Sequence, residues 1–229
     1  MMEKEDVLAI LERNQAVIRD SHVVYTSGKH GSAYVNKDGL YPHSADTSKI
    51  CKAIAEEFME DDVEVVIAPA VGGVILSQWV SFHLSALTGY EVLGVYAEHE
   101  EQLVRSTRIP LLEGEKLIVR KTTFITNRGY VNLIPGKRVL VVEDILTTGG
   151  SAKAVIEATR IVGGEVIGLG VICNRGGVKP EDVGNVPKLF SLIDVRLEAY
   201  AESECPLCKA GVPINIEVGK GKEYLSSHL

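Results

Sequence analysis

Short apolar runs alternate with amphipathic segments through most of the chain. Runs rich in β-branched residues predict strands over residues 63–68, 92–97, 117–120, 138–142, 165–173 and 188–193. Apolar positions at helical spacing predict helices over residues 6–17, 44–59, 73–87 and 151–162. Because the strands are almost continuously apolar and helices lie between them, we expect an α/β fold with a parallel twisted sheet covered on both faces.

The two ends of the chain fall outside this alternation. We therefore expect a single domain over residues 1–229, with a core over about residues 41–195 and a small hood formed by residues 1–40 and 196–229. In a parallel sheet, ligands bind at the carboxyl ends of the strands, where the chain enters loops and helices. The chemistry should therefore lie just after Ala68, Ala97, Arg120, Val142 and Cys173.

Charge and composition exclude several classes of protein. The chain carries 24 Lys and Arg against 31 Asp and Glu, and this net charge of −7 argues against a protein that mainly neutralises nucleic-acid phosphates. The uncharged run over residues 65–76 is too short for a bilayer span and contains Pro69 and two glycines. The acidic first residues do not resemble an export signal. We expect a cytoplasmic protein that binds neither nucleic acid nor membranes.

The four cysteines do not indicate a disulfide scaffold. Cys51 and Cys173 lie in apolar segments, as buried small hydrophobic residues do. Cys205 and Cys208 form a single CxxC, but a structural zinc site needs four ligands, and no second CxxC or His pair lies nearby in the sequence. We favour two reduced thiols in a capped tail over a zinc site, and the sequence leaves the alternative open.

The segment after residues 138–142 carries the clearest chemistry. Two carboxylates are followed by a loop of small and hydroxyl residues and then by a helix. Glycines let backbone N–H groups approach an anion closely, and a helix N-terminus favours phosphate. Carboxylates accept hydrogen bonds from sugar hydroxyls or reach them through a divalent cation. The pattern predicts a ribose 5-phosphate site; the alternative is an acidic turn that binds nothing. The residues are Glu143, Asp144, Thr147, Thr148, Gly149, Gly150 and Ser151.

This stretch resembles the phosphoribosyl-diphosphate (PRPP) signature of the type I phosphoribosyltransferases. The resemblance implies that Glu143 and Asp144 hold the ribose hydroxyls and that the following loop holds the 5′-phosphate. It also implies Mg²⁺ as cofactor, held mainly through PRPP with a contact to Asp144 left open and no other protein ligand. Some members of this family are regulators that bind PRPP without catalysing, so the signature alone does not establish an enzyme.

Three further segments, over residues 27–38, 68–73 and 174–176, are similar to those of the orotate phosphoribosyltransferases, and so is the tail over residues 204–213. An Arg fork grips a carboxylate at two points, and orotate carries a carboxylate that purines lack. The resemblance implies that the orotate-binding residues are Lys29, Tyr34, Val35, Thr147 and Arg175. It implies that the pyrophosphate is bound by Val71, Gly72 and Gly73.

A mobile loop of the family is matched only in part. Arg120 and Lys121 fit its start, but Phe124 and Thr126 stand where relatives carry a Lys and a His. A second alignment matches Arg128 to a shorter loop and treats residues 97–126 as partly an insertion. We expect Arg120, Lys121 or Arg128 to supply the cation over the pyrophosphate, and the sequence does not choose among them.

The resemblance implies an enzyme of pyrimidine synthesis that joins orotate to PRPP, giving orotidine 5′-monophosphate and pyrophosphate. Glu143, Asp144, Arg120 and Lys121 would be the catalytic residues. A homodimer is implied, because related enzymes complete the site with the partner's loop. The alternatives are a type I phosphoribosyltransferase that acts on a purine or uracil, and a PRPP-binding regulator without turnover.

Overall fold

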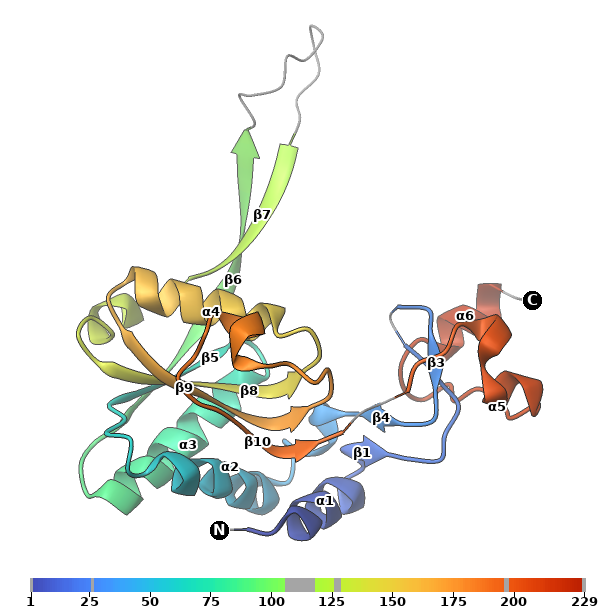
Figure 1. Cartoon of the computed structure of the whole chain (residues 1–229), viewed down its shortest axis with the longest axis horizontal. Coiled ribbons are helices and arrows are strands. Elements are labelled where there is room, and N and C mark those ends of the chain that lie inside the picture. Colours follow the sequence, from blue (N-terminus) through green and yellow to red (C-terminus); the bar gives the residue numbers. More distant parts are fainter. Residues whose placement is uncertain (1, 26, 106–117, 126–128, 196–197, 228–229) are drawn as a thin grey trace, which may run out of the picture.

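The computed structural model describes residues 2–25, 27–105, 118–125, 129–195 and 198–227, without the side chains of residues 37, 99–105 and 118–125. Its central sheet has the strand order β10-β9-β8-β5-β6-β7 (Figure 1). The strands are β5 (Val65–Pro69), β6 (Leu93–Arg105), β7 (Ile118–Ile125), β8 (Arg138–Leu146), β9 (Glu165–Asn174) and β10 (Leu189–Asp194). The predicted parallel α/β sheet is confirmed for all of these strands except β7.

The strand predicted over residues 117–120 is wrong as a member of the parallel sheet. β7 runs antiparallel to β6, and the two form a long hairpin that extends out of the domain (Figure 1). Residues Leu93–Ala97 of β6 pair with β5, whereas the pairing with β7 begins at Glu98. The positions after Ala97 and Arg120 are therefore not strand ends. The strand predicted over residues 92–97 ends where the apolar run ends, but a strand that projects beyond the covering helices need not be apolar.

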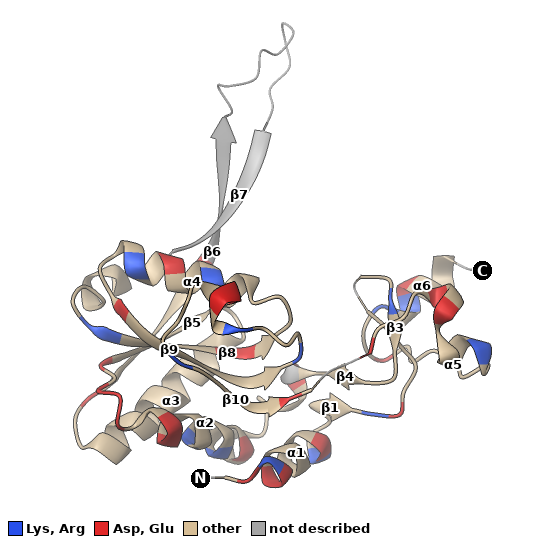
Figure 2. Ribbon diagram, viewed as in Figure 1, with Lys and Arg blue, Asp and Glu red and all other residues tan. Residues whose placement is uncertain are grey.

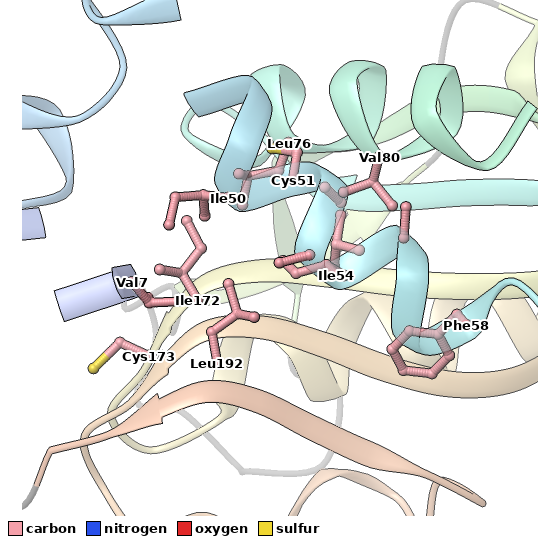
Figure 3. Packing of buried hydrophobic residues seen from close by; sticks show 14 of the residues in the cluster. Val7, Ile50, Cys51, Ile54, Phe58, Leu76, Val80, Ile172, Cys173 and Leu192 are labelled. Atoms are coloured by element: carbon pink, nitrogen blue, oxygen red, sulfur yellow. The ribbon is translucent and has the colours of Figure 1, made fainter. Parts of the chain in front are cut away.

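Helices cover both faces of the sheet. On one face lie α2 (Ser44–Phe58) and α3 (Gly73–Thr88), and on the other lies α4 (Gly150–Ile161). Because side chains alternate along a strand, Val66 and Leu140 pack toward α2 and α3, while Val65 and Val139 pack toward α4. The first cluster is drawn in Figure 3, where Ile50 and Ile54 of α2 lie between the labelled residues of α3 and those of β9 and β10.

Helix α1 (Lys4–Arg13) packs on the sheet side of the molecule. Its buried residues Val7, Ile10 and Leu11 join the cluster of α2 and α3, although residues 1–40 were grouped with the hood (Figure 3). The helix ends earlier than residue 17, and Val17 instead begins a short strand. The hood itself therefore starts after this helix.

The hood is built from both ends of the chain and lies beyond the carboxyl ends of β8, β9 and β10 (Figure 1). Its antiparallel pairs are β1 (Val17–Ile18) with β4 (Tyr34–Val35), and β2 (Val23–Val24) with β3 (His30–Gly31). The C-terminal segment adds α5 (Pro206–Lys209) and α6 (Gly221–Ser227). Short 3₁₀ helices occur at Lys37–Gly39, Tyr130–Leu133, Pro180–Val183 and Glu202–Glu204.

Backbone hydrogen bonds join the N-terminal and C-terminal parts of the hood. His30 and Tyr200 exchange two of them, each 2.8 Å long, and the Asn215 N–H donates to the His22 carbonyl at 2.7 Å. Acidic and basic residues are interspersed along α1, α2, α4 and α6, whereas α3 carries neither (Figure 2). Among the described helices, none is long and apolar enough to cross a membrane.

Candidate active site

A cavity of about 560 Å³ lies between the carboxyl ends of the sheet strands and the hood. The sheet side contributes the turn after β5, the end of β8 and the residue after β9. The hood side contributes the β2–β3 turn and the segment from β4 to the first 3₁₀ helix. The lining residues are Tyr25, Ser27, Tyr34, Val35, Asn36, Asp38, Pro69, Ala70, Val71, Gly72, Gly73, Glu143, Asp144, Ile145, Thr147, Ser151 and Arg175.

The two carboxylates Glu143 and Asp144 occupy the end of β8 and are only 8% and 5% exposed. The Tyr41 hydroxyl donates to Asp144 Oδ2 at 3.0 Å, and the Ile145 N–H donates to Asp144 Oδ1 at 2.7 Å. The buried Tyr41 and the neighbouring Asp144 charge raise the pKa of the Tyr41 hydroxyl, so it remains a donor. Both oxygens of Asp144 are thus held in a defined direction.

The loop from Thr147 to Ser151 encloses a smaller cavity of about 180 Å³, which shares Glu143, Thr147 and Ser151 with the larger one. Thr148, Gly149 and Gly150 line this smaller cavity. Helix α4 begins at Gly150, and the first N–H groups of a helix have no partner within it, which suits an anion.

The backbone conformation at position 149 requires a glycine, independently of the predicted contact of this loop with a phosphate. Its φ is 74°, in the left-handed region, and a Cβ would lie 2.6 Å from the Val183 side chain. The glycine therefore shapes the loop and lets it pack on the chain after β9.

Arg175 lies where the end of β9 meets the hood. Its N–H and that of Gly176 both donate to the Leu146 carbonyl, at 2.8 and 2.9 Å, which ties the ends of β8 and β9 together. The Arg175 guanidinium carbon is 5.6 Å from the centre of the Tyr25 ring. Burial raises the pKa of the Tyr25 hydroxyl, and this effect outweighs the positive charge of Arg175, which lowers it. The Tyr25 hydroxyl donates to the Ala33 carbonyl at 2.6 Å.

The turn after β5 completes the sheet side. Val71, Gly72 and Gly73 line the cavity, the Ala70–Val71 peptide bond is cis, and the Val71 side chain is 85% exposed. Helix α3 begins at Gly73, so the positive end of its dipole lies at the cavity wall.

The structure brings most of the predicted site residues to this cavity. Lys29 is different: it is exposed on the β2–β3 turn and is not among the lining residues, whereas Tyr25 and Ser27 of the same segment are. Arg120 and Lys121 lie on the backbone of β7, and their side chains, like Arg128 as a whole, lie outside the described residues.

Sequence reasoning missed Tyr25, Asn36 and Asp38 in the cavity wall, and Tyr41 behind Asp144. Tyr41 precedes Asp144 by 103 positions, so no spacing within the chain links them. Only the packing of the segment before α2 against the end of β8 brings the hydroxyl to the carboxylate.

Comparison with known proteins agrees with this geometry. Residues 40–203 match the phosphoribosyl transferase domain. The chain is 36% identical to the orotate phosphoribosyltransferase of Caldanaerobacter subterraneus subsp. tengcongensis, over 93% of this chain and 96% of the relative. It is 34% identical to that of Desulforamulus reducens, over 93% and 95% of the two chains.

Solved structures show the same fold. The orotate phosphoribosyltransferase from Aeropyrum pernix superposes with a TM-score of 0.58 at 24% identity, covering 82% of this chain and 93% of that one. The adenine phosphoribosyltransferase from Rhodothermus marinus superposes with a TM-score of 0.53 at 21% identity, covering 82% and 99% of the two chains. At these sequence identities the superpositions establish the fold but not which base the enzyme uses.

Proposed function

This chain belongs to the phosphoribosyl transferase family and, within it, to the orotate phosphoribosyltransferases, and from that premise we propose how its cavity works. In this proposal orotate displaces pyrophosphate from PRPP and gives orotidine 5′-monophosphate, a step of pyrimidine synthesis. The observation that carries the proposal is a cavity lined by Glu143, Asp144 and Arg175, which adjoins the smaller cavity of the Thr147–Ser151 loop.

In the proposed complex, the phosphate, ribose and base of the substrates contact different walls of the cavity. The 5′-phosphate would lie in the smaller cavity at the start of α4, where backbone N–H groups and the Thr147 and Ser151 hydroxyls can donate. Glu143 and Asp144 would accept hydrogen bonds from the ribose hydroxyls. The Arg175 fork would bind the orotate carboxylate, with the base beside Tyr34 and Val35 of the hood.

In the proposed reaction the protein forms no covalent bond with the substrates. It aligns them and stabilises the charges that develop. The bond between the anomeric carbon and the pyrophosphate oxygen breaks, and its electron pair leaves with pyrophosphate. Orotate N1, as the anion, supplies the pair for the new bond. Positive charge develops on the sugar between these events, so alignment of the two substrates and neutralisation of pyrophosphate lower the barrier.

The charges of the described cavity wall explain why further cations are needed. Asp38, Glu143 and Asp144 provide carboxylates, and Arg175 is the one Lys or Arg side chain among the described lining residues. Mg²⁺ takes oxygen ligands, carboxylates among them, so this donor set fits the cofactor, which would be held mainly through PRPP with Asp144 as the candidate protein contact. Mg²⁺ bound with PRPP would supply charge neutralisation. Arg120, Lys121 or Arg128 would supply the rest.

A homodimer is the assembly we propose. The β6–β7 hairpin extends away from its own sheet, as a segment that reaches a second copy would (Figure 1). We also propose a cytoplasmic location, since none of the described cysteines forms a disulfide.

The experiment that tests the reaction compares bases. Pyrophosphate release from PRPP is measured with orotate, uracil, hypoxanthine, guanine, xanthine and adenine, each with and without Mg²⁺. We expect turnover with orotate alone, and only when Mg²⁺ is present. Preference for a purine or uracil would overturn the substrate, and PRPP binding without turnover on any base would favour the regulator.

A further inference from the structure

Four potential metal ligands meet in the hood, away from the cavity. His22 lies just before β2 and His30 lies in β3, whereas Cys205 lies just before α5 and Cys208 lies within it. Their ligand atoms all lie within 4.8 Å of one another. His22, His30 and Cys205 are 2% exposed or less, and Cys208 is half-buried. None of the four lines the cavity between the sheet and the hood.

The separations are those of a tetrahedral site. Cys208 Sγ lies 3.2 Å from His30 Nδ1 and 3.6 Å from His22 Nε2, and Cys205 Sγ lies 3.7 Å from His22 Nε2. Around one zinc ion, bond lengths of about 2.3 Å to sulfur and about 2.0 Å to nitrogen place tetrahedral S and N ligands about 3.5 Å apart. The two imidazole nitrogens are 3.0 Å apart, against about 3.3 Å around zinc, so binding requires the two rings to move slightly apart.

The second nitrogen of His22 orients the ring. His22 Nδ1 lies 2.7 Å from the Val212 carbonyl oxygen, which can only accept, so Nδ1 carries the proton. Nε2 then presents its lone pair to His30, Cys205 and Cys208. When one ring nitrogen of a histidine binds a metal, the other ring N–H usually donates to an acceptor such as a backbone carbonyl.

We propose that His22, His30, Cys205 and Cys208 bind one structural Zn²⁺ ion. Two thiolates and two imidazoles in tetrahedral positions suit zinc better than Mg²⁺ or Ca²⁺, which take oxygen ligands. All four positions are filled by protein, so the ion has no open site for a substrate and acts as a crosslink. This inference does not depend on the proposed reaction, since it concerns a different set of residues.

The crosslink joins segments that are far apart in the sequence. His22 and Cys205 are separated by 183 positions, and the link adds to the backbone hydrogen bonds between the two ends of the chain. Tyr25 and Ser27, which line the cavity, lie on the turn between the two histidines. Zinc binding would therefore hold the hood wall of the cavity in place.

The test measures metal directly on the full chain. The protein is purified without a metal-affinity tag, and its metal content is measured by inductively coupled plasma mass spectrometry. We expect one zinc per chain. Cobalt substituted for zinc should give the intense visible bands of a four-coordinate site and a thiolate-to-cobalt charge-transfer band. Cys208→Ser and His22→Gln should lose most of the zinc. Cys51→Ala and His43→Gln, outside the cluster, should retain it.

A second measurement does not rely on variants that fold. Removal of zinc from the wild-type chain by a chelator should make residues 198–227 susceptible to limited proteolysis, and added Zn²⁺ should restore resistance. Zinc absent from the purified chain and not bound on addition would overturn the proposal. So would an intact Cys205–Cys208 disulfide in protein purified with or without reductant, or octahedral, sulfur-free cobalt spectra.

Discussion

The sheet and the hood are held together in different ways. The sheet buries long apolar side chains in two clusters, one on each face, and residues such as Ile54, Leu76 and Leu140 are completely inaccessible to solvent. In the hood, Val17 of β1 and Val35 of β4 join the first of these clusters, whereas the buried Val23 and Val24 of β2 belong to neither. Next to these two valines, the buried His22, His30 and Cys205 meet the half-buried Cys208.

The difference follows from size. A few short segments cannot bury enough apolar surface to offset their loss of chain entropy, so small units need crosslinks or metal ions in addition. The cavity lies between the two regions. Its sheet wall is therefore part of the stable core, whereas its hood wall depends on the contacts between the two ends of the chain.

The largest effect is expected from a cavity in the sheet cluster. Ile54→Ala should lower the free energy of unfolding by about 2–5 kcal/mol, because it removes buried methyl groups and leaves a void. Urea unfolding followed by circular dichroism measures this. The matched hood variant Val24→Ala should have a smaller effect on global unfolding. Equal losses would mean that hood and sheet unfold as one unit, which contradicts the comparison.

Arg175 connects the two regions, and its loss should act on substrate binding. Arg175→Ala should raise the KM for orotate about ten- to a hundredfold, since a charged hydrogen bond contributes about 1.5–3 kcal/mol. Arg175→Lys should recover only part of this, because an ammonium keeps the charge but loses the two-point fork. The KM for PRPP should change little.

Thermal denaturation separates this role from a structural one. If Arg175 only supports the junction of β9 with the hood, Arg175→Ala should lower Tm and worsen both KM values together. An unchanged orotate KM in a stable variant would remove Arg175 from the base site.

On the sheet wall, Asp144→Asn should lower turnover at least tenfold, about 1.4 kcal/mol in the barrier. The substitution removes the charge proposed to bind the ribose hydroxyls but keeps an oxygen that can accept from Tyr41. Glu143→Gln should lose less. The exposed Asp20→Asn is the matched control and should have wild-type kinetics. Wild-type kinetics in folded Asp144→Asn would contradict the ribose assignment.

The smallest effect concerns the contact between α1 and α2. Hydrogen bonds from Arg13 and Asn14 lower the pKa of Asp46 to about 2. Because this folded-state pKa is depressed, the pair stabilises the protein above pH about 4, and the stabilisation is lost as the pH falls toward about 2. Asp46→Asn should lack this stabilisation above pH about 4, and the stabilities of the two proteins should converge as the pH falls toward about 2. An identical acid dependence in both proteins would contradict this linkage.

The sequence by itself determined the features in which neighbouring residues act together. The apolar runs predicted the strands of the parallel sheet, because burial on both faces leaves a local pattern. Glu143, Asp144 and the Thr147–Ser151 loop were predicted as one site because a strand, a turn and a helix N-terminus follow each other directly.

Only the tertiary structure decided the contacts between distant segments. The direction of β7 depends on its pairing with β6, and a short apolar run does not encode the direction of its neighbour. Tyr41 reaches Asp144, and Tyr25 reaches Arg175, across long stretches of chain. His22 and His30 meet Cys205 and Cys208 only because the hood closes the two ends of the chain on each other. A metal site can be recognised from the sequence when its ligands lie close together in the chain at a characteristic spacing. Here the two pairs of ligands come from opposite ends of the chain, so no such spacing exists.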